Sequence, residues 1–414
     1  MKTSGLIVAL IIIVIVGFGA LGYSIISLNN DIQKEIANLN STLLSTNNKI
    51  ETSFNKNLSN LAIVLGSLES GIKNFNNSIN NQIVYLKQEI NSLSKQNEFP
   101  VSLIDATNTT VIISQYPTRI ISLDPSTTDL LLAINATNQI VGVDNASLYY
   151  LPPQYENQLL SLYKEGKIIN IGDTYYGLDI EKIMSLNPDL IIATYGYGSS
   201  ASTSVFKEYG IPVLLLPSFN SLDGLYNSII MVGMATGNTK EAAALVENMS
   251  ESIAYLSSLT INQTHYNIAL IGWIDPTYVT GNNTFQNNMI ILSGNKNAFS
   301  NISWWGVISP EEILEANPSI IIMPTNYFNE SDLISWLNST IGNAYKNISA
   351  IRYGRVYVIR GYYIDYIDEP GPMTVEGLEL LIALTHPNVL NITSIPPIIT
   401  PSDFPLPKLT VFSS

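Results

Sequence analysis

The sequence predicts an α/β protein in which one long helix joins two lobes of similar construction. Short aliphatic runs alternate with helical patterns twice along the chain, over residues 99–221 and 263–394. A helical pattern over 222–262 separates these two series. In addition, LDIEKIMSLNPDLIIATYG at 178–196 aligns without a gap with ISPEEILEANPSIIIMPTN at 308–326, at an offset of 130 residues. We therefore expect both lobes to contain the same helix-to-strand unit.

Residues 1–27 are predicted to form an N-terminal transmembrane anchor. The segment 6–26 contains no charged residue, and its length is sufficient for a helix to cross a bilayer. A cleavable signal peptide would have a shorter apolar core and a small-residue cleavage site. Lys2 is the only nearby charge, and the positive-inside tendency places the remaining chain outside. We therefore predict a single-pass protein of the cell membrane whose body is extracellular.

Residues 28–98 are predicted to form a coiled-coil stalk. Between 28 and 93 the chain has no proline, and apolar residues recur every three or four positions. A four-residue insertion between Ile50 and Leu61 indicates a stutter. A helix of this length spans roughly 100 Å and would form a homo-oligomer through its apolar seam. A helix folded back on the body and a partly disordered spacer are the alternatives.

The remaining chain is predicted to contain an N-terminal lobe (99–221), an interlobe helix (222–262), a C-terminal lobe (263–394) and a Pro-rich tail (395–414). Aliphatic runs mark strands, and the β–α–β–α order predicts a parallel sheet covered by helices. The expected strands of the two lobes are VIISQYP, RIISLD, IVGVD, DLIIAT and PVLLLPS, followed by NIALIGWI, SIIIMP and RVYVIR.

Composition excludes several function classes. Only 13% of the residues are charged and the formal net charge is −14, so a nucleic-acid partner is not expected. The absence of cysteine excludes disulfides and thiolate metal sites. His265 and His386 have no patterned serine or acidic partner, so we expect no enzyme, catalytic residue, metal site or cofactor. For the acidic residues of the segment 365–369, a solvated loop is favoured over a calcium site.

Asn-x-Ser/Thr sequons recur from Asn40 to Asn391, in a chain that is rich in amide and hydroxyl side chains. Sequons of this kind can carry glycans on secreted or surface proteins. The composition therefore suggests a glycoprotein of the archaeal cell surface.

The order of several motifs over 117–388 resembles the class III substrate-binding proteins of ABC importers. The motifs are RIISLDPSTTDLLLAI, IVGVDN, IGDTYYGLDIEKIMSLNPDLIIA, DPTYVTGNNTFQNNMIILSGNKNAFS, WGVISPEEILEANPSIII and GRVYVI. The resemblance implies two Rossmann-like lobes, a ligand held between them, and delivery to ABC permease and ATPase subunits. It is closest to the vitamin B12-binding members, so cobalamin is the expected ligand, with an iron-siderophore complex or haem as alternatives.

The resemblance also implies a docking role for one acidic residue near the start of a helix in each lobe. Matched by position, these residues are Glu181 and Glu311. Helix capping is the alternative role for such acids, and SPEE at 309–312 fits a capping box. We expect Asp179 to cap the first helix and Ser309 with Glu312 to cap the second, which leaves Glu181 and Glu311 to contact the permease. Asp129 is expected to form a similar box with Ser126.

Aromatic side chains are the expected ligand contacts, because flat apolar surfaces suit a large planar macrocycle. Family positions match at Tyr175 and Trp305. Packing in the core or on the surface is the alternative for each residue. Further aromatic residues in loops expected at the cleft are Tyr149, Tyr195, Trp273 and Tyr278.

Four arginines occur, and only Arg360 follows a predicted strand toward the cleft. Strongly anionic siderophores would need a cluster of basic groups. This favours cobalamin, haem or a neutral hydroxamate complex. A function of a different class also stays open, namely a structural or adhesive surface protein whose binding fold is only a scaffold.

Overall fold

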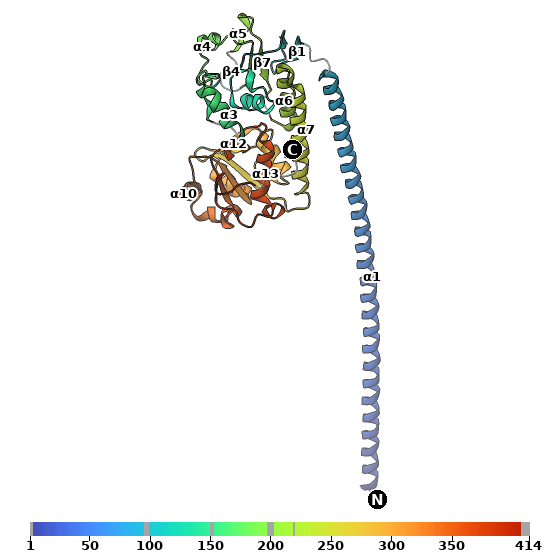
Figure 1. Cartoon of the computed structure of the whole chain (residues 1–414). Helices are drawn as coiled ribbons and strands as arrows, with labels where there is room; N and C mark the ends of the chain where they lie inside the picture. The colour runs from blue at the N-terminus through green and yellow to red at the C-terminus, as the bar shows by residue number, and fades with distance from the viewer. Residues whose placement is uncertain (1–2, 95–98, 150–152, 197–202, 218–219, 407–414) are drawn as a thin grey trace. The chain divides into compact units, whose positions relative to one another are not determined.

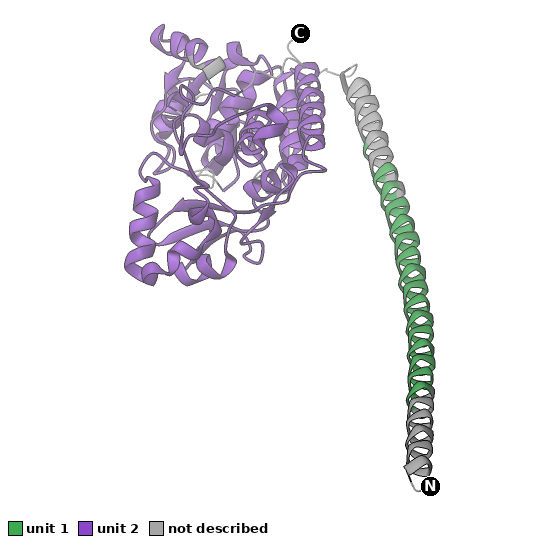
Figure 2. Cartoon of the chain, turned by 90° about the horizontal axis from the view of Figure 1, so that it is seen from below, with its two compact units in different colours: residues 1–86 green, residues 87–414 purple. Residues whose placement is uncertain are grey.

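The computed structural model describes the backbone of residues 3–94, 99–149, 153–196, 203–217 and 220–406. It describes most of the side chains in these ranges, those of 3–20, 23, 70, 74, 76–78, 80–94, 153, 154 and 156 excepted. The chain divides into two compact units, residues 1–86 and 87–414 (Figure 2).

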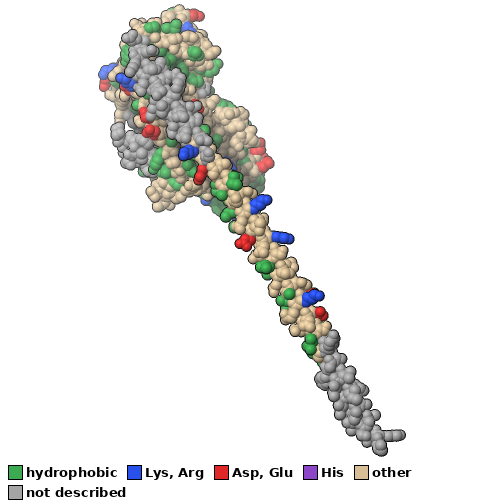
Figure 3. Space-filling model, turned by 90° about the vertical axis from the view of Figure 1, so that its right-hand side faces the viewer, with side chains coloured by type: hydrophobic (Ala, Val, Ile, Leu, Met, Phe, Trp, Pro, Cys, Tyr) green, Lys and Arg blue, Asp and Glu red, His purple; other side chains and the backbone are tan. Residues whose placement is uncertain are grey.

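The first unit is helical throughout its described residues. Helix α1 spans Thr3–Ser94 without a proline, and its hydroxyl groups bond back to carbonyls of the preceding turn, as Thr42 Oγ1 does to Asn38 O (2.9 Å). Its large apolar side chains between Leu21 and Ile79 are 38–71% exposed, and Figure 3 shows them distributed along the helix. The predicted helix of the stalk is confirmed, whereas its assembly into a coiled coil stays a prediction.

The predicted membrane span at 6–26 falls mostly on side chains outside those that the structure describes. Within the described residues, no helix has both the length and the apolar character that a membrane crossing requires.

The N-terminal lobe contains a parallel sheet in the order β5-β4-β3-β6-β7, and Figure 1 labels β4 and β7 of this sheet. Its four longer strands are buried on both faces and are mostly aliphatic, as expected for a parallel sheet covered by helices, whereas the edge strand β5 is half-buried. The strands are β3 (Ile120–Ser122), β4 (Ile140–Val143), β5 (Ile169–Asn170), β6 (Leu190–Thr194) and β7 (Val213–Leu216). The covering helices are α2 (Pro125–Ala133), α3 (Pro153–Lys164), α4 (Ile180–Ser185) and α5 (Ser204–Glu208), with 3-10 helices at Thr137–Gln139 and Ala146–Leu148.

One expected strand of this lobe lies outside the parallel sheet. The run VIISQYP contributes β2 (Thr110–Ile113), which pairs antiparallel with β1 (Val101–Ile104) as a separate two-stranded sheet. A five-residue loop joins these strands and includes Asn108 at φ +61°. Because this connection is short, it permits only antiparallel pairing.

The C-terminal lobe contains a mixed sheet in the order β11-β9-β8-β12-β13-β14, with β10 also paired to β8. Its strands are β8 (Asn267–Trp273), β9 (Thr277–Thr280), β10 (Lys296–Asn297), β11 (Trp305–Ile308), β12 (Ile320–Pro324), β13 (Val356–Ile359) and β14 (Ile398–Ile399). Its helices are α8 (Phe285–Leu292), α9 (Pro310–Ala316), α10 (Glu330–Ile341), α11 (Ser349–Arg352), α12 (Tyr363–Asp368) and α13 (Thr374–Thr385), with 3-10 helices at Gly342–Asn347 and Pro387–Leu390.

Part of the predicted tail belongs to this lobe. Strand β14 pairs with β13, and Ile399 and Phe404 are buried in the core. The Tyr363 hydroxyl donates to Phe404 O (3.1 Å) and accepts from Leu406 N (3.2 Å). The prediction of a separate tail over 395–414 is therefore wrong up to residue 406, and residues 407–414 lie outside the described range.

The stretch predicted as one interlobe helix consists of two. Helix α6 (Leu222–Thr236) ends at Gly237, whose φ of +75° is the left-handed conformation that terminates helices, and α7 (Thr239–Ser258) follows. The two helices pack side by side, and a Cβ at Gly233 would lie 2.4 Å from Ala242 Cβ (Figure 1). The prediction missed this break because the apolar spacing continues across it.

Helix α7 contributes buried side chains to both cores, and Tyr226 of α6 and Val375 of α13 also pack against both. In α7, Ala242 and Met249 belong to the N-terminal core, and Ile253 and Leu256 belong to the C-terminal core. Helix α6 lies on the N-terminal core through Leu225, Ile229 and Val232.

Candidate functional site

The repeated unit begins in both lobes with a capped helix. Asp179 Oδ1 accepts from Lys182 N (3.0 Å) at the start of α4. At the start of α9, Ser309 Oγ accepts from Glu312 N (3.3 Å), and Glu312 Oε2 accepts from Ser309 N (2.7 Å). These caps are the ones that the sequence predicted.

Glu181 and Glu311 follow these caps at equivalent positions in the first turn. Both side chains are exposed, and neither forms a hydrogen bond or ion pair with any residue in the described part of the chain. The next core residues, Ile183 and Ile313, are each 0% exposed. Each lobe therefore presents one exposed carboxylate without a described partner, at the same position of a matching helix.

Three predicted tyrosines lie at the carboxyl ends of strands in the N-terminal lobe. Tyr149 follows β4, Tyr175 follows β5 and Tyr195 directly follows β6. Their side chains are 75%, 62% and 47% exposed, so none serves mainly as core packing. The carboxyl edge of a parallel sheet is where ligands usually bind in this kind of fold.

Buried aspartates hold two of these tyrosine-bearing loops. Asp124 caps α2, accepting from Thr127 N (2.8 Å), and also accepts from Thr194 N (2.6 Å) beside Tyr195. Asp144 accepts from Ser147 N (3.1 Å) and from Ser147 Oγ in the turn that leads to Tyr149. Burial raises the pKa of both carboxyl groups, that of Asp144 to about 6, although the hydrogen bonds act in the opposite direction.

The cap at Asp124 corrects the prediction that Asp129 pairs with Ser126 in a capping box. Asp129 lies within α2 rather than at its third position, because the helix begins at Pro125. Its Oδ1 is buried without a hydrogen-bond partner. Ser126 instead donates to Glu369 Oε2 in the other lobe (3.0 Å).

The predicted aromatic residues of the C-terminal lobe share one face of the mixed sheet. Val307 pairs with Tyr278 and Trp305 pairs with Thr280, so Tyr278, Trp305 and Val307 lie on the same side. Trp273 is also a partner of Tyr278, at a bulge between β8 and β9. The indole of Trp305 lies against Gly272, where an added Cβ would be 3.1 Å from Cζ3.

Tyr327 and Phe328 extend this surface, and sequence reasoning missed them. The ring of Phe328 packs edge-on against Trp273 with centroids 4.7 Å apart, and Tyr327 lies 5.9 Å from Trp273. Both residues lie in the loop that follows β12, so the search for aromatic residues in loops after strands that selected Tyr195 could have found them. The surface formed by Trp273, Tyr278, Trp305, Tyr327 and Phe328 is called the aromatic face below.

Trp304 is a third residue that the sequence did not reveal. Its φ of +68° is unusual for a bulky side chain, and such strain often marks functional segments. Gly281 N donates to Trp304 O, and Trp304 N donates to Asn282 O, both at 2.8 Å. A Cβ at Gly281 would lie 2.5 Å from Trp304 O, so the close approach requires glycine there.

Arg360 positions the loop that carries Tyr327 and Phe328. Its guanidinium donates to Asn329 Oδ1 (2.7 Å), Phe328 O (3.0 Å) and Thr325 O (3.3 Å). The guanidinium is thus directed at its own lobe rather than left as an open anion-binding group. The ring contacts that the structure describes all stay within one lobe.

No cluster of histidine, aspartate or glutamate with metal-binding geometry occurs among the described residues. His265 Nδ1 contacts Gly294 O at 2.5 Å, and His386 is buried beside Tyr266. Burial lowers the pKa of His386, so this imidazole is held neutral.

Comparison with known proteins shows what kind of molecule this architecture belongs to. The sequence is 29% identical over 300 residues to an uncharacterized ABC transporter substrate-binding lipoprotein of Bacillus subtilis (strain 168), covering 71% of this chain and 88% of the relative. It is 23% identical over 294 residues to a cobalamin-binding protein of Halobacterium salinarum, covering 70% and 74%.

A solved structure also superposes on the body. It is a periplasmic solute-binding protein of Staphylococcus epidermidis described as a possible iron-binding protein, and the match has a TM-score of 0.55 at 26% identity. The match covers 65% of this chain and 98% of that protein. The named relatives are binding proteins of transporters rather than enzymes, in agreement with the expectation from sequence.

The lobes, the connecting helix and the order of motifs between them are thus those of a known family. Its sequence profile matches residues 120–363, which is more than half of the chain. The chain belongs to the periplasmic binding protein family, whose fold here is the class III arrangement of two α/β lobes joined by one helix.

Proposed function

We propose that this protein captures cobalamin or a related metal chelate between its two lobes and delivers it to the permease of an ABC importer. The observation that carries the proposal is the presence of exposed aromatic side chains at strand ends in both lobes. These are the tyrosines at 149, 175 and 195 on one side and Trp273, Tyr278 and Tyr327 of the aromatic face on the other, whereas Trp305 and Phe328 are half-buried. Aromatic surfaces of this kind suit a large, flat, largely apolar ligand.

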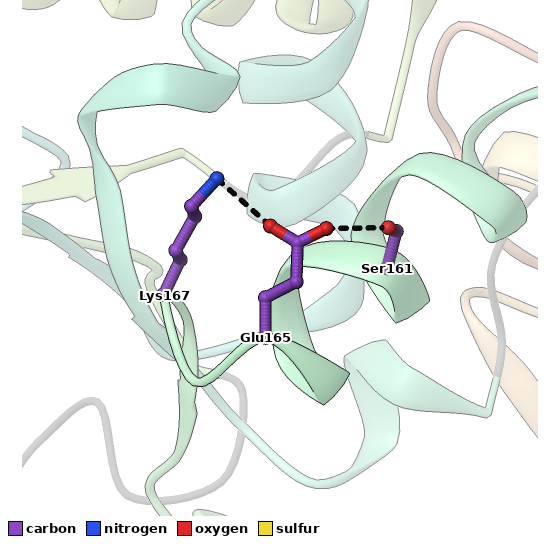
Figure 4. Close-up of polar contacts among 3 residues, drawn as sticks. All are labelled: Ser161, Glu165 and Lys167. Carbon is purple, nitrogen blue, oxygen red and sulfur yellow. Dashed lines mark hydrogen bonds and ion pairs between the residues drawn. The ribbon is translucent and has the colours of Figure 1, made fainter.

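The charge around these residues favours a ligand that carries little negative charge. Arg360 is committed to backbone and amide oxygens of its own lobe. Lys167, in the N-terminal lobe, pairs with Glu165 at 2.8 Å on the surface (Figure 4). An iron-hydroxamate complex and haem are the alternative ligands, and haem is the least favoured because its carboxylates lack a described cationic partner.

The other parts of the proposal concern delivery. Glu181 and Glu311 would dock on the permease, since both are exposed and neither caps its helix. Residues 6–26 would anchor the chain in the cell membrane, and α1 would act as a homo-oligomeric stalk that buries its exposed apolar side chains. The extracellular body would carry glycans at exposed sequons such as Asn301 and Asn338.

The ligand is tested by titrating the detergent-solubilised full chain with cyanocobalamin, a ferric hydroxamate complex and haemin. Binding is followed by tryptophan fluorescence and calorimetry. We expect cobalamin to bind at least about tenfold more tightly than haemin, a difference of about 1.4 kcal/mol. If the hydroxamate complex or haemin binds more tightly than cobalamin, that compound becomes the proposed ligand instead. If none of the three binds and uptake does not require the protein, the structural or adhesive surface function is the better reading.

A further inference from the structure

A small cavity lies where the two lobes meet. It has a volume of about 20 Å³, enough for about one water molecule. The N-terminal lobe lines it with the start of α2, which follows β3, and the C-terminal lobe lines it with α12, which follows β13. The cavity therefore lies at the carboxyl ends of strands of both sheets, and we call this contact region the seam.

The seam concentrates carboxyl groups from both lobes. Asp129 of α2 lines the cavity opposite Asp365 of α12 and Glu369. Asp368, at the end of α12, adds a fourth carboxyl group, on which the charges of Glu369 and Asp365 act. Asp129 Oδ1 and Asp368 Oδ1 are both buried without a hydrogen-bond partner in the described structure.

Among the described residues, the elements around the seam supply no compensating positive charge. The described titratable groups that line the cavity are Asp129, Tyr362, Asp365, Tyr366 and Glu369. The carboxyl groups that interact electrostatically with them are Asp124 at α2, Asp368 at α12 and Glu376 of α13. Helix α8 contributes the neutral Gln286, whose Nε2 donates to Asp368 O (3.2 Å). None of these carboxyl groups forms an ion pair with a described lysine, arginine or histidine.

The two lobes nevertheless touch each other at the seam, and this contact constrains the protonation of the carboxyl groups there. The hydrogen bond from Ser126 Oγ to Glu369 Oε2 joins the lobes at 3.0 Å. Several ionised carboxylates in one poorly solvated place would repel each other and lose hydration. A closed seam is therefore compatible with carboxyl groups that retain protons.

The direction of the pKa shifts agrees with this geometry. Burial, followed by the charges of Glu369 and Asp365, raises the pKa of Asp129 well above its usual range. Burial, followed by the charge of Glu369, raises the pKa of Asp365 to about 7 and that of Asp368 well above its usual range. These groups titrate as a coupled set rather than one by one.

We propose that the seam is a proton-dependent latch, which holds the lobes together while its carboxyl groups are protonated and releases them as the groups ionise. This inference rests on the proposed function for its biological meaning, because closed lobes would retain the ligand and separated lobes would release it. The sign follows from linkage: the closed state binds more protons than the open state, so raising the pH favours opening. The change falls between the ordinary pKa of an aspartate, about 4, and the raised values of the closed seam.

The latch is tested by measuring the distance between the lobes as a function of pH. The chain has no cysteine, so Lys207→Cys on α5 and Ser339→Cys on α10 create a unique pair of labelling sites on exposed positions. Spin-labelled full-length protein is diluted with unlabelled protein to suppress distances between copies. Pulsed electron resonance then gives the distribution at about pH 5 and about pH 8, on either side of the Asp365 transition.

We expect the distribution to move to longer distances at the higher pH, and to stay at the short distance in the Asp129→Asn/Asp365→Asn variant. Glu208→Gln, which neutralises an exposed acid of α5, should retain the shift. An identical distribution at both pH values would overturn the latch. So would a shift that persists unchanged in the double variant.

Ligand titrations at the same two pH values separate this inference from the proposed function. With a working latch, cobalamin binds at least about tenfold more weakly at the higher pH, which is the factor expected for a group whose pKa differs by about one unit between the closed and open lobes. If no chelate binds at any pH but the distances shift, the proposed function fails and the latch stands. If cobalamin binds equally at both pH values and the distances do not move, the latch fails and the proposed function stands.

Discussion

At the scale of single residues, acidic residues that lie one to five positions apart in the sequence have different roles. Glu312 completes a capping box, whereas Glu311 beside it has no described partner. Asp124 caps α2 and fixes Thr194, whereas Asp129 Oδ1 is buried without a hydrogen-bond partner in the described structure. The caps could be predicted because they depend on contacts within three residues. The environment of Asp129 could not, because Glu369 lies in the other lobe.

Replacing Asp124 by asparagine should destabilise the N-terminal lobe. An amide cannot accept all of the hydrogen bonds that the carboxylate receives from Thr127 and Thr194, so a buried donor loses its partner. The expected loss in the free energy of unfolding is about 1–3 kcal/mol. Chemical denaturation measures it, and Asp173→Asn at an exposed position is the control. Equal stability of the two variants would show that the Asp124 contacts contribute little.

Arg360 is expected to act on the ligand through the loop at 325–329. Arg360→Met removes its three hydrogen bonds and frees Tyr327 and Phe328 to leave Trp273. We expect about tenfold weaker cobalamin binding and a changed tryptophan spectrum. Arg352→Met, at an exposed position of α11, should leave both unchanged. Weaker binding in Arg360→Met with an unchanged spectrum would indicate direct ligand contact instead of positioning.

At the scale of elements, the α/β alternation and the doubled unit followed from local signals. Asn187 and Asn317 both take a positive φ directly before a proline, which ends the repeated helices in the same way. Other features depended on distant partners. The break at Gly237 is enforced by packing of α6 on α7, and β14 is a strand only because β13 offers an edge. The loop contacts of Arg360 likewise join residues that are more than thirty positions apart.

Gly237 offers a test of the break between α6 and α7. An alanine there would adopt a left-handed φ of +75°, and its Cβ would lie 2.8 Å from the Tyr116 ring. Gly210 has a similar φ of +74° with open space around it. We expect Gly210→Ala to cost about 1 kcal/mol for backbone strain, and Gly237→Ala to cost about 1–3 kcal/mol more for the collision. Equal losses in denaturation experiments would mean that Tyr116 moves aside freely.

Strand β14 offers both a buried test position and an exposed control position. Ile399 is 0% exposed and its neighbour Ile398 is 40% exposed. Ile399→Ala should lower the free energy of unfolding by about 2–5 kcal/mol, whereas Ile398→Ala should cost less than about 1 kcal/mol. Thermal and chemical unfolding of both variants measure the difference. Comparable values would mean that the strand contributes little to the core of the C-terminal lobe.

At the scale of the whole molecule, the docking proposal predicts a separation of binding from transport. The Glu181→Ala/Glu311→Ala variant should bind cobalamin as the unaltered protein does but support little uptake in cells. Neither glutamate forms a described hydrogen bond with a residue of the aromatic face. A variant with two other exposed acids replaced, Glu208→Ala/Glu251→Ala, should support normal uptake. Normal uptake in both variants would remove the docking role.

Because Glu181 and Glu311 stand on different lobes, their separation changes whenever the lobes move relative to each other. An exposed ion pair contributes only about 0–1 kcal/mol, so a receptor gains useful affinity only by engaging both carboxylates at once. Such a receptor senses spacing as well as charge. The spacing of the two helices then reports the state of the ligand site to the receptor, without any contact between the receptor and the ligand.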